Sequence, residues 1–471
     1  MLTRLLRAEI GAISVIGIGG LAFAISGRLF FPWPLEWMEG GTLAHAVRML
    51  GGEAIYRAPT AEFVPYLYPP LSYLPIAASV LAFGESLPAA RLPSVLSTVA
   101  TLWLLGRAAL HIGGGRLGAL LAAGLWGLGY GYGGAFHDLA RVDAFFLLLV
   151  AGGSERLLAN RPRTSLALFA LSFFAKQHGA LFLIAASIWL AWKDWRRHLP
   201  GLVGAWGATI FLAVALHLDS DGWFGRYCFS LPRSHGVLWR LVPGYLALDV
   251  LLALPVIAAT AIASTVRRAR DPRAVDVLLV AALAASALGR AHIGGFDNVL
   301  LPAYALLCVV ASTAIAPVLS GDTQRPALRA GVGAALLVQA LVLFQPPTAH
   351  WPAPDAGARF RALVRTMQTC AGGGRAVALD HSGLGGTPFA HTMALSDLRE
   401  GGDTWLSRAG TRALVRGLRG SRAPAAVAVG ARFPALDEAL ARGYQLCDAA
   451  PAPPMATGFP VPDAIVYTRA P

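Results

Sequence analysis

Two carboxylates begin the part of the chain with the clearest potential for chemistry. Glu36 and Glu39 lie within the segment Pro34–Gly41, and Glu39 is followed by two glycines. A carboxylate at a reaction site can act as a general base that accepts the proton of a hydroxyl group. We expect Glu39 to be this base, because Gly40 and Gly41 let the backbone approach a ligand closely. Glu36 is a second candidate, although a solvated loop carboxylate would give the same pattern.

Two basic side chains are suited to holding an anion near such a base. Lys176 is one of only two lysines among the 39 basic residues, and arginine supplies the other positive charges. A compact ammonium suits a phosphate oxygen as a point charge. We expect Lys176 and Arg141 to bind a phosphate group. Two alternatives stay open: Lys176 snorkels to the external headgroups, or Arg141 forms a structural ion pair with Asp143.

Further polar residues occur at the same ends of the apolar segments. Ionisable groups inside a membrane are unfavourable and usually mark a functional cavity. We expect Asp138 to join Glu36 and Glu39 in the catalytic set, unless it only caps a helix. The other expected substrate-binding residues are Tyr68, Asp143, Gln177, Arg290, His292, Asp297 and Asn298. We interpret Arg48 and Arg91 instead as interfacial residues whose charges snorkel to the membrane surface.

The elements that must position these residues are membrane helices. Hydrophobic residues make up 56% of the 471 positions, charged residues only 14%, and the mean hydropathy is +0.57. A soluble chain would carry roughly a quarter charged residues. Apolar runs of about 17–25 residues, enough to cross hydrocarbon, recur between residues 10 and 345. We therefore predict an α-helical polytopic membrane protein, with a transmembrane domain over residues 1–345 and an external soluble domain over residues 346–471.

The arginine distribution predicts the orientation of the helices. With the N-terminus in the cytoplasm, about eleven transmembrane helices place the arginine clusters in short cytoplasmic segments, as the positive-inside rule requires. The apolar piece Leu71–Phe83 is short for a span, so we interpret it as an interfacial or re-entrant helix. The stretch Ile10–Gly27, which follows Arg4 and Arg7, resembles a signal peptide, but its length favours an uncleaved first helix. This path leaves the C-terminal domain outside.

Charge and cysteine usage narrow the partners. The net charge of +13 does not indicate a nucleic-acid surface, because arginines are dispersed between apolar spans. The four cysteines have no metal-type spacing; we predict no cofactor, and a divalent metal stays open. Cys370 and Cys447 either pair in an oxidising compartment or remain thiols.

The last 126 or so residues read as a small α/β domain, because strand-like and helix-like stretches alternate. The expected strands are 375–380, 425–429 and 464–468, and the expected helices are 404–419 and 436–442. Asp380 and His381 follow the first strand and could form a site, although a turn is the favoured interpretation. We expect this domain to cover the groove or to help select an acceptor.

Proton-accepting carboxylates beside anion-binding cations fit the transfer of a sugar from a lipid phosphate. The acceptor hydroxyl needs a general base, and the leaving phosphate needs fixed positive charge. A transporter or lipid-linked sugar flippase is the alternative, since it would also gather charges near helix ends. Transporters commonly contain inverted repeats and midplane sites, and we recognise no internal repeat here.

The chain resembles the GT-C fold glycosyltransferases, and most closely the bacterial protein mannosyltransferase and aminoarabinose transferase types. The resemblance rests on four features: the acidic element Glu36/Glu39, Tyr68-Pro69-Pro70-Leu71 where relatives often have His-Pro-Pro-Leu, the stretch from Gly84 to Pro93, and Arg141-Val142-Asp143 with Lys176-Gln177. Here the family's adjacent acidic pair is Glu-Trp-Met-Glu, and Phe296–Pro302 has no counterpart. The resemblance implies an inverting transfer from a polyprenyl-phosphate sugar to an acceptor glycan, lipid or protein. It places that reaction at the periplasmic face of the bacterial inner membrane.

Overall fold

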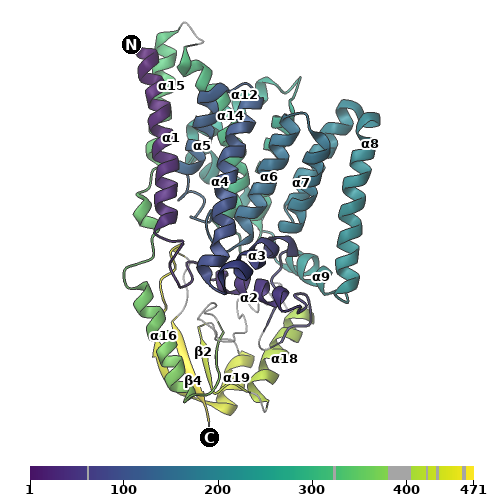
Figure 1. Cartoon of the computed structure of the whole chain (residues 1–471), viewed down its shortest axis with the longest axis vertical. Helices are drawn as coiled ribbons and strands as arrows, with labels where there is room; N and C mark the ends of the chain where they lie inside the picture. Colours follow the sequence, from purple (N-terminus) through teal and green to yellow (C-terminus); the bar gives the residue numbers. More distant parts are fainter. Residues whose placement is uncertain are drawn as a thin grey trace.

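A bundle of long helices carries a small sheet at one end in the computed structural model of the chain (Figure 1). The structure describes residues 1–60, 63–321, 325–379, 405–420, 423–430, 434–458 and 463–470. The N-terminus lies at the end of the bundle remote from the sheet, and the C-terminus lies beside the sheet.

Among the described residues, ten elements form the bundle. They are α1 (Leu2–Ser26), α4 (Leu87–His111), α5 (Gly115–Leu128), α6 (Val142–Leu158), α7 (Pro162–Ala175), α8 (Gly179–Asp219), α12 (Pro255–Arg267), α13 (Ala274–Ala291), α14 (Leu301–Ser320) and α15 (Pro326–Leu343). Helix α8 consists of two helices joined at a kink, where Asp194 has non-helical dihedral angles.

Each of the eleven predicted segments has a helical counterpart when α8 is counted as two. By length and composition, six of the described helices could cross a membrane, or seven if a bent pair counts as one span. Helices α5 and α7 have 14 residues each and fall below the length of a full span, whereas α6, with 17 residues, is at its lower limit.

The eighth predicted helix is broken rather than continuous. It consists of α11 (Leu241–Gly244) and the π-helix η3 (Tyr245–Leu252), followed by α12, and the two parts meet at 106°. Pro255 begins α12, and Leu254 before it has φ −123° and ψ 46°. A proline has no N–H and disfavours helical geometry in the residue before it, so the break occurs there.

Short helices lie across the end of the bundle nearest the sheet (Figure 1). Helix α2 (Glu39–Leu50) and helix α3 (Tyr73–Phe83) are the largest of them, and the 3₁₀ turn η1 (Pro70–Ser72) precedes α3. With 11 residues, α3 rises about 16 Å, which is too short to span hydrocarbon. The smaller elements of this region are α9 (Trp223–Gly225), η2 (Arg226–Ser230), α10 (Leu231–Ser234), η4 (Asp297–Leu300) and η5 (Pro347–His350).

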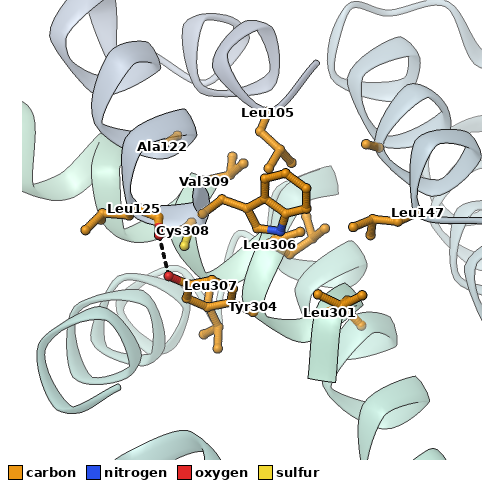
Figure 2. Close-up of a cluster of buried hydrophobic side chains, with 14 of the residues drawn as sticks. Leu105, Ala122, Leu125, Leu147, Leu301, Tyr304, Leu306, Leu307, Cys308 and Val309 are labelled. Atoms are coloured by element: carbon orange, nitrogen blue, oxygen red, sulfur yellow. Dashed lines mark hydrogen bonds between the residues drawn. The ribbon is translucent and has the colours of Figure 1, made fainter. Parts of the chain in front are cut away.

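The helices of the bundle pack closely against one another. Figure 2 shows side chains of α14 meeting those of α4, α5 and α6, and the Tyr304 hydroxyl donates a hydrogen bond to the Leu125 carbonyl. Helices α1 and α5 approach so closely that a Cβ at Gly124 would lie 2.4 Å from the Ser14 Cα. Small residues at such crossings allow backbone contact, which is how helices associate in lipid.

The described residues of the C-terminal region form a four-stranded mixed sheet with the order β1-β2-β4-β3. Its elements are β1 (Ala376–Ala378), β2 (Ala426–Val429), β3 (Tyr444–Ala450) and β4 (Ala464–Arg469), with the helices α16 (Ala356–Ala371), α18 (Trp405–Arg419) and α19 (Pro434–Gly443). Strand β1 pairs parallel to β2, and the other pairs are antiparallel. The sheet confirms the predicted α/β character, whereas α16 and β3 were not predicted. Asp380 and His381 lie outside the described residues.

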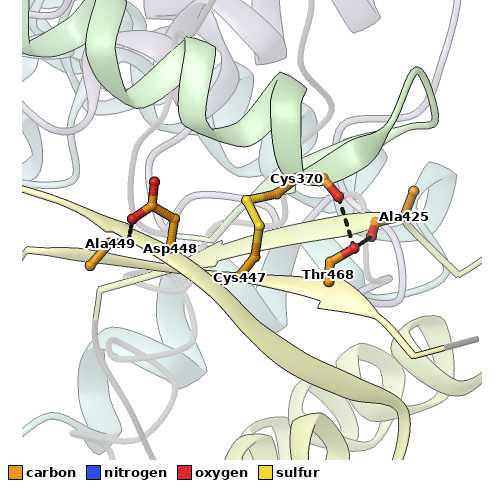
Figure 3. The surroundings of a disulfide bond; sticks show 6 residues. All are labelled: Cys370, Ala425, Cys447, Asp448, Ala449 and Thr468. Atoms are coloured by element: carbon orange, nitrogen blue, oxygen red, sulfur yellow. Dashed lines mark hydrogen bonds between the residues drawn. A yellow bond between two sulfur atoms is a disulfide. The ribbon is translucent and has the colours of Figure 1, made fainter.

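A disulfide joins this region together. Cys370 at the end of α16 pairs with Cys447 in β3, and the Thr468 hydroxyl of β4 donates to the Cys370 carbonyl at 2.8 Å (Figure 3). The bridge closes a loop of 77 residues. Of the two pairing states that the sequence leaves open, the structure has the disulfide.

Candidate functional site

A cavity of about 490 Å³ lies at the end of the bundle that carries α2 and α3. Its walls come from the loop before α2, the start of α6, the α7–α8 turn, the η2–α10 segment and the loop after α13. The polar residues that line it are Glu36, Tyr68, Arg141, Lys176, Gln177, His178, His235, His292 and Asn298. Segments far apart in sequence therefore bring most of the predicted polar residues around one space.

Arg141 stands at the N-terminus of α6 in an extended conformation, with φ −137° and ψ 171°. Its Nη1 donates to the Glu36 Oε1 at 2.6 Å, and its Nε lies 3.3 Å from the Asp143 Oδ2. Its Nη2 lies 3.3 Å from the hydroxyl of Tyr68. The guanidinium is thus oriented by two carboxylates and a phenol, and it borders the cavity.

Lys176 occupies the break between α7 and α8, where the backbone is extended. Its Nζ lies 2.6 Å from the Asp143 Oδ1, and the Asn298 Nδ2 donates to the same oxygen at 2.9 Å. The lysine is only 6% exposed, so its side chain points inward. Lys176 therefore does not snorkel to the headgroups, which was the alternative interpretation.

Gln177 and His292 line the cavity and also bind the backbone. The Gln177 Nε2 donates to the carbonyls of Leu67 and Cys228, at 2.5 and 2.9 Å. The His292 Nε2 lies 3.0 Å from the Pro232 carbonyl. These contacts connect the α7–α8 turn and the loop after α13 to the opposite wall.

Glu36 is the carboxylate that borders the cavity. Besides its contact with Arg141, its Oε2 accepts the Met38 N–H at 2.8 Å. Burial raises the pKa of Glu36 to about 7, although Arg141 and the Met38 N–H act in the opposite direction. A carboxyl group with a pKa near neutrality is well matched to general-base catalysis. The solvated-loop interpretation of Glu36 is wrong, because the residue is 1% exposed.

Glu39 points away from this cavity, contrary to the expectation that it is the base. Its two oxygens accept from Nε and Nη2 of Arg91, at 2.8 and 2.7 Å, and from the backbone N–H groups of Leu35 and Ala140. Burial opposes its ionisation, yet the Arg91 pair and these N–H donors hold the pKa of Glu39 below its ordinary value. Glu39 does not line the cavity, so the geometry gives it a positioning role.

Arg91 is therefore not an interfacial residue. It is fully buried, and besides Glu39 it donates to the carbonyls of Phe31 and Trp33 at 2.5 and 2.7 Å. Its guanidinium holds the loop that carries Glu36 onto α4. The expectation that Arg91 snorkels to the surface is wrong, because carbonyl and carboxylate acceptors inside the protein satisfy its charge.

Asp138 belongs to a second buried ion pair rather than to the cavity wall. Its Oδ1 accepts from the Tyr130 hydroxyl at 2.7 Å, and its Oδ2 lies 3.1 Å from the Arg28 Nε. Burial raises the pKa of Asp138, with Arg28 acting against that rise. The catalytic role expected for Asp138 has no support in this placement.

Arg290 and Asp297 form a third group beside the cavity. The Arg290 Nε lies 2.8 Å from the Asp249 Oδ2, and its Nη2 lies 2.9 Å from the Asp297 Oδ1. Neither Arg290 nor Asp297 lines the cavity, whereas the neighbouring Asn298 does. Of the residues predicted here, Asn298 therefore lines the cavity, whereas Arg290 and Asp297 form an ion pair beside it.

No role was assigned from the sequence to three residues of this region. His178 and His235 line the cavity, and Arg28 pairs with Asp138. His178 follows Lys176 and Gln177 directly, and that adjacency is a signal for it. His235 lies in a segment without a motif, and Arg28 is a lone charge at the end of an apolar helix. Within the described ranges, no group of three or more His, Cys, Asp or Glu residues could hold a metal ion.

No family model and no curated protein matches the chain. Several solved structures do match, among them ArnT from Cupriavidus metallidurans bound to undecaprenyl phosphate, with a TM-score of 0.62 at 13% identity, and the same protein in the apo state, with a TM-score of 0.60 at 15% identity. The first match covers 99% of this chain and 98% of the ArnT chain, and the second covers 98% of each.

Similarity over nearly the whole length of both chains includes the bundle and the terminal sheet together. At such low identity the match shows the fold alone. The chain has the GT-C glycosyltransferase fold.

Proposed function

We propose that the protein transfers a sugar from a polyprenyl-phosphate donor to an acceptor hydroxyl group. The observation that carries the proposal is the cavity in which a buried carboxylate, Glu36, lies beside two buried cations, Arg141 and Lys176. A hydroxyl acceptor needs a base, and a phosphate leaving group needs fixed positive charge. One cavity of this chain offers both.

Arg141 and Lys176 hold the donor phosphate in this proposal. Asp143 contacts both cations and keeps them pointed at the same space. A phosphodiester oxygen that enters between them would gain two charge-assisted hydrogen bonds, which are roughly twice as strong as neutral ones. As the glycosidic bond breaks, its electron pair moves to the phosphate oxygen, where both cations stabilise the added charge.

Glu36 is the proposed base. Its carboxylate accepts the proton of the acceptor hydroxyl while the hydroxyl oxygen attacks the anomeric carbon from the face opposite the phosphate, which inverts the configuration. A bound phosphate competes with Glu36 for Arg141. A carboxylate that shares its cationic partner is more basic, so donor binding prepares Glu36 for its role.

The lipid nature of the donor is inferred from the fold and the location of the cavity. The similar ArnT structure holds undecaprenyl phosphate. In this chain the short apolar helix α3 lies across the end of the bundle near the cavity. An interfacial helix of this kind sits at the headgroup level, where a lipid phosphate would be found.

We infer that the cavity faces the periplasm of a bacterial inner membrane. The arginine-rich turns lie at the opposite end of the bundle, as the positive-inside rule requires of a cytoplasmic side. The disulfide between Cys370 and Cys447 supports an oxidising compartment for the sheet, because disulfides persist in the periplasm and not in the cytosol.

This orientation predicts the labelling of an introduced cysteine. Arg442 on α19 has a side chain that is 65% exposed, and Arg442→Cys should react with a membrane-impermeant maleimide in intact spheroplasts. Arg196→Cys, at the other end of the bundle, should react only after lysis. The reverse pattern would contradict the orientation.

Release of polyprenyl phosphate is the direct test of the function. Purified protein would be incubated with a panel of undecaprenyl-phosphate sugars and with extracts that contain candidate acceptors. We expect free undecaprenyl phosphate to accumulate with one donor only when acceptor is present. Movement of a labelled lipid-linked sugar across proteoliposomes without release would instead support the transporter or flippase.

A further inference from the structure

Two adjoining cavities lie between α7 and the second half of α8, the pair of helices seen at the edge of the bundle in Figure 1. One is an apolar groove of about 500 Å³, and the other is a polar pocket of about 420 Å³. Arg163 and Gly201 line both, so the groove and the pocket adjoin. Helix α7 begins at Pro162 beside the pocket and ends beside Lys176, so the pocket is at the end of the bundle opposite the candidate site.

The polar pocket has a positive lining. Arg161, Arg163, Arg197 and His198 line it together with Asn160 and Thr164, and no carboxylate is among the lining residues. Within the part of the chain that the structure describes, the side chains of these three arginines form no ion pair and donate no hydrogen bond. Asp194, the acidic residue nearest to Arg197 along the chain, accepts the backbone N–H of Arg197 rather than pairing with its side chain. The pocket therefore offers several uncompensated positive charges and hydrogen-bond donors.

The length and the lining of the groove suit an acyl chain. Along α7 it extends from Arg163 to Phe174, a rise of about 16 Å, which is close to half of the roughly 30 Å hydrocarbon core. Its α8 wall consists mainly of small residues, Gly201, Gly204, Ala205 and Ala208, which leave room for a chain of methylenes. A Cβ at Gly204 would have nothing within 4 Å.

We propose that this composite site binds one anionic glycerophospholipid of the bilayer, such as phosphatidylglycerol. The phosphate would lie among Arg161, Arg163 and Arg197, and one acyl chain would fill the groove. Charge complementarity selects an anionic lipid, because basic pockets between membrane helices bind anionic headgroups. A zwitterionic headgroup would bring its own cation into a pocket that has no carboxylate to receive it. The inference uses no residue of the candidate site and is independent of the proposed function.

Native mass spectrometry of the full-length protein can test the site directly. Protein in detergent would be titrated with phosphatidylglycerol, phosphatidylcholine or undecaprenyl phosphate, with soluble glycerol 3-phosphate as a competitor. We expect one saturable phosphatidylglycerol and much weaker retention of phosphatidylcholine. Glycerol 3-phosphate, which lacks an acyl chain, should not displace it at comparable concentration.

Matched variants separate the pocket and the groove from general lipid adhesion. Arg161→Gln together with Arg163→Gln should weaken phosphatidylglycerol binding about 25-fold, at about fivefold for each arginine. Gly204→Phe should occupy the groove and remove the retained lipid. Their controls are Arg196→Gln, which does not line the pocket, and Gly207→Phe, an open position on the same helix that does not line the groove. Both controls should bind as the unmodified protein does.

Three results would overturn the site. They are equal retention of phosphatidylcholine, an unchanged affinity in the double arginine variant, and retention of undecaprenyl phosphate alone. Because Arg161 and Arg163 are exposed, their replacement should not prevent folding, and the test stands even if Gly204→Phe expresses poorly.

Discussion

Two carboxylates three positions apart, Glu36 in the loop before α2 and Glu39 at the first residue of α2, have completely different surroundings. Glu36 borders the cavity, contacts Arg141 and has a pKa raised to about 7 by burial. Glu39 is enclosed by Arg91 and two backbone N–H groups, and its pKa is held low. Glu39 accepts four hydrogen bonds and is a fixed structural charge. Glu36 has a pKa near 7 and contacts Arg141, which also borders the cavity, so Glu36 can exchange a proton. The difference separates a group that builds the site from a group that we propose reacts in it.

The same contrast extends to the cations. Arg91 and Arg28 are fully buried and hold loops onto helices. Arg141 and Lys176 are also nearly buried, but they border the cavity and are held by Asp143. Burial alone therefore does not identify a functional charge in this protein. Contact with the cavity is what distinguishes the two cations that we propose bind the donor.

The largest effect is expected on stability, when Glu39 loses its buried partner Arg91. Arg91→Met would leave Glu39 as a buried carboxylate without its cation, and breaking such a pair typically costs about 3–5 kcal/mol. We expect a strong fall in melting temperature and in yield from membranes. Arg48→Met, whose ion pair with Glu53 is partly exposed, is the control and should change stability by less than about 1 kcal/mol. A stable Arg91→Met protein would remove the structural role assigned to this pair.

A smaller effect on binding is expected from Lys176→Met. The donor phosphate would lose a charge-assisted partner worth roughly 1.5–3 kcal/mol, which is about 10- to 150-fold in affinity. Asp143 would keep Arg141 and Asn298 as partners, so the fold should survive. Donor affinity can be measured in detergent with undecaprenyl phosphate as the ligand.

Two control variants make this measurement specific to the cavity. Lys193→Met removes the other lysine, and Arg290→Met removes a cation beside the cavity that does not line it. Both should retain donor affinity. A loss in Arg290→Met that equals the loss in Lys176→Met would return Arg290 to the binding set.

The pH dependence should report Glu36. A base must be ionised, and burial raises the pKa of Glu36 in the free protein to about 7, so kcat/KM should fall as the pH drops below about 7, by about tenfold per pH unit. Glu36→Gln should lose this acidic limb along with most of the rate. An acidic limb in the unmodified protein at the ordinary carboxyl pKa of about 4.3 would indicate a solvated base elsewhere.

Much of the fold could be predicted because lipid imposes strict rules on a sequence. Apolar length and arginine placement predicted the segments of the bundle, including the short helix that begins after Pro70. The break before Pro255 was missed because a single proline in an apolar run has no effect on its hydropathy. Strand β3 was missed because most of its residues are exposed, so it lacks the alternation that marks a half-buried strand.

The candidate site was predicted only in part, because the surroundings of its carboxylates depend on ion pairs with residues that are distant in sequence. Arg141, Asp143, Lys176 and Asn298 were singled out by type and position, and the fold brings them together. The choice between Glu36 and Glu39 depends on Arg91, which lies 52 residues beyond Glu39. Local spacing carries no information about such a partner, and the glycines after Glu39 favoured the carboxylate that does not line the cavity.

The most direct test compares Glu36→Gln and Glu39→Gln side by side, with equal amounts of folded protein and with donor binding measured separately. Removing a positioned general base typically lowers the rate by about 10²–10⁴-fold. We predict that Glu36→Gln loses turnover by that factor while it keeps its stability and its donor affinity. Glu39→Gln should lose stability and keep most of its turnover per folded molecule. A stable, inactive Glu39→Gln beside an active Glu36→Gln would contradict the account.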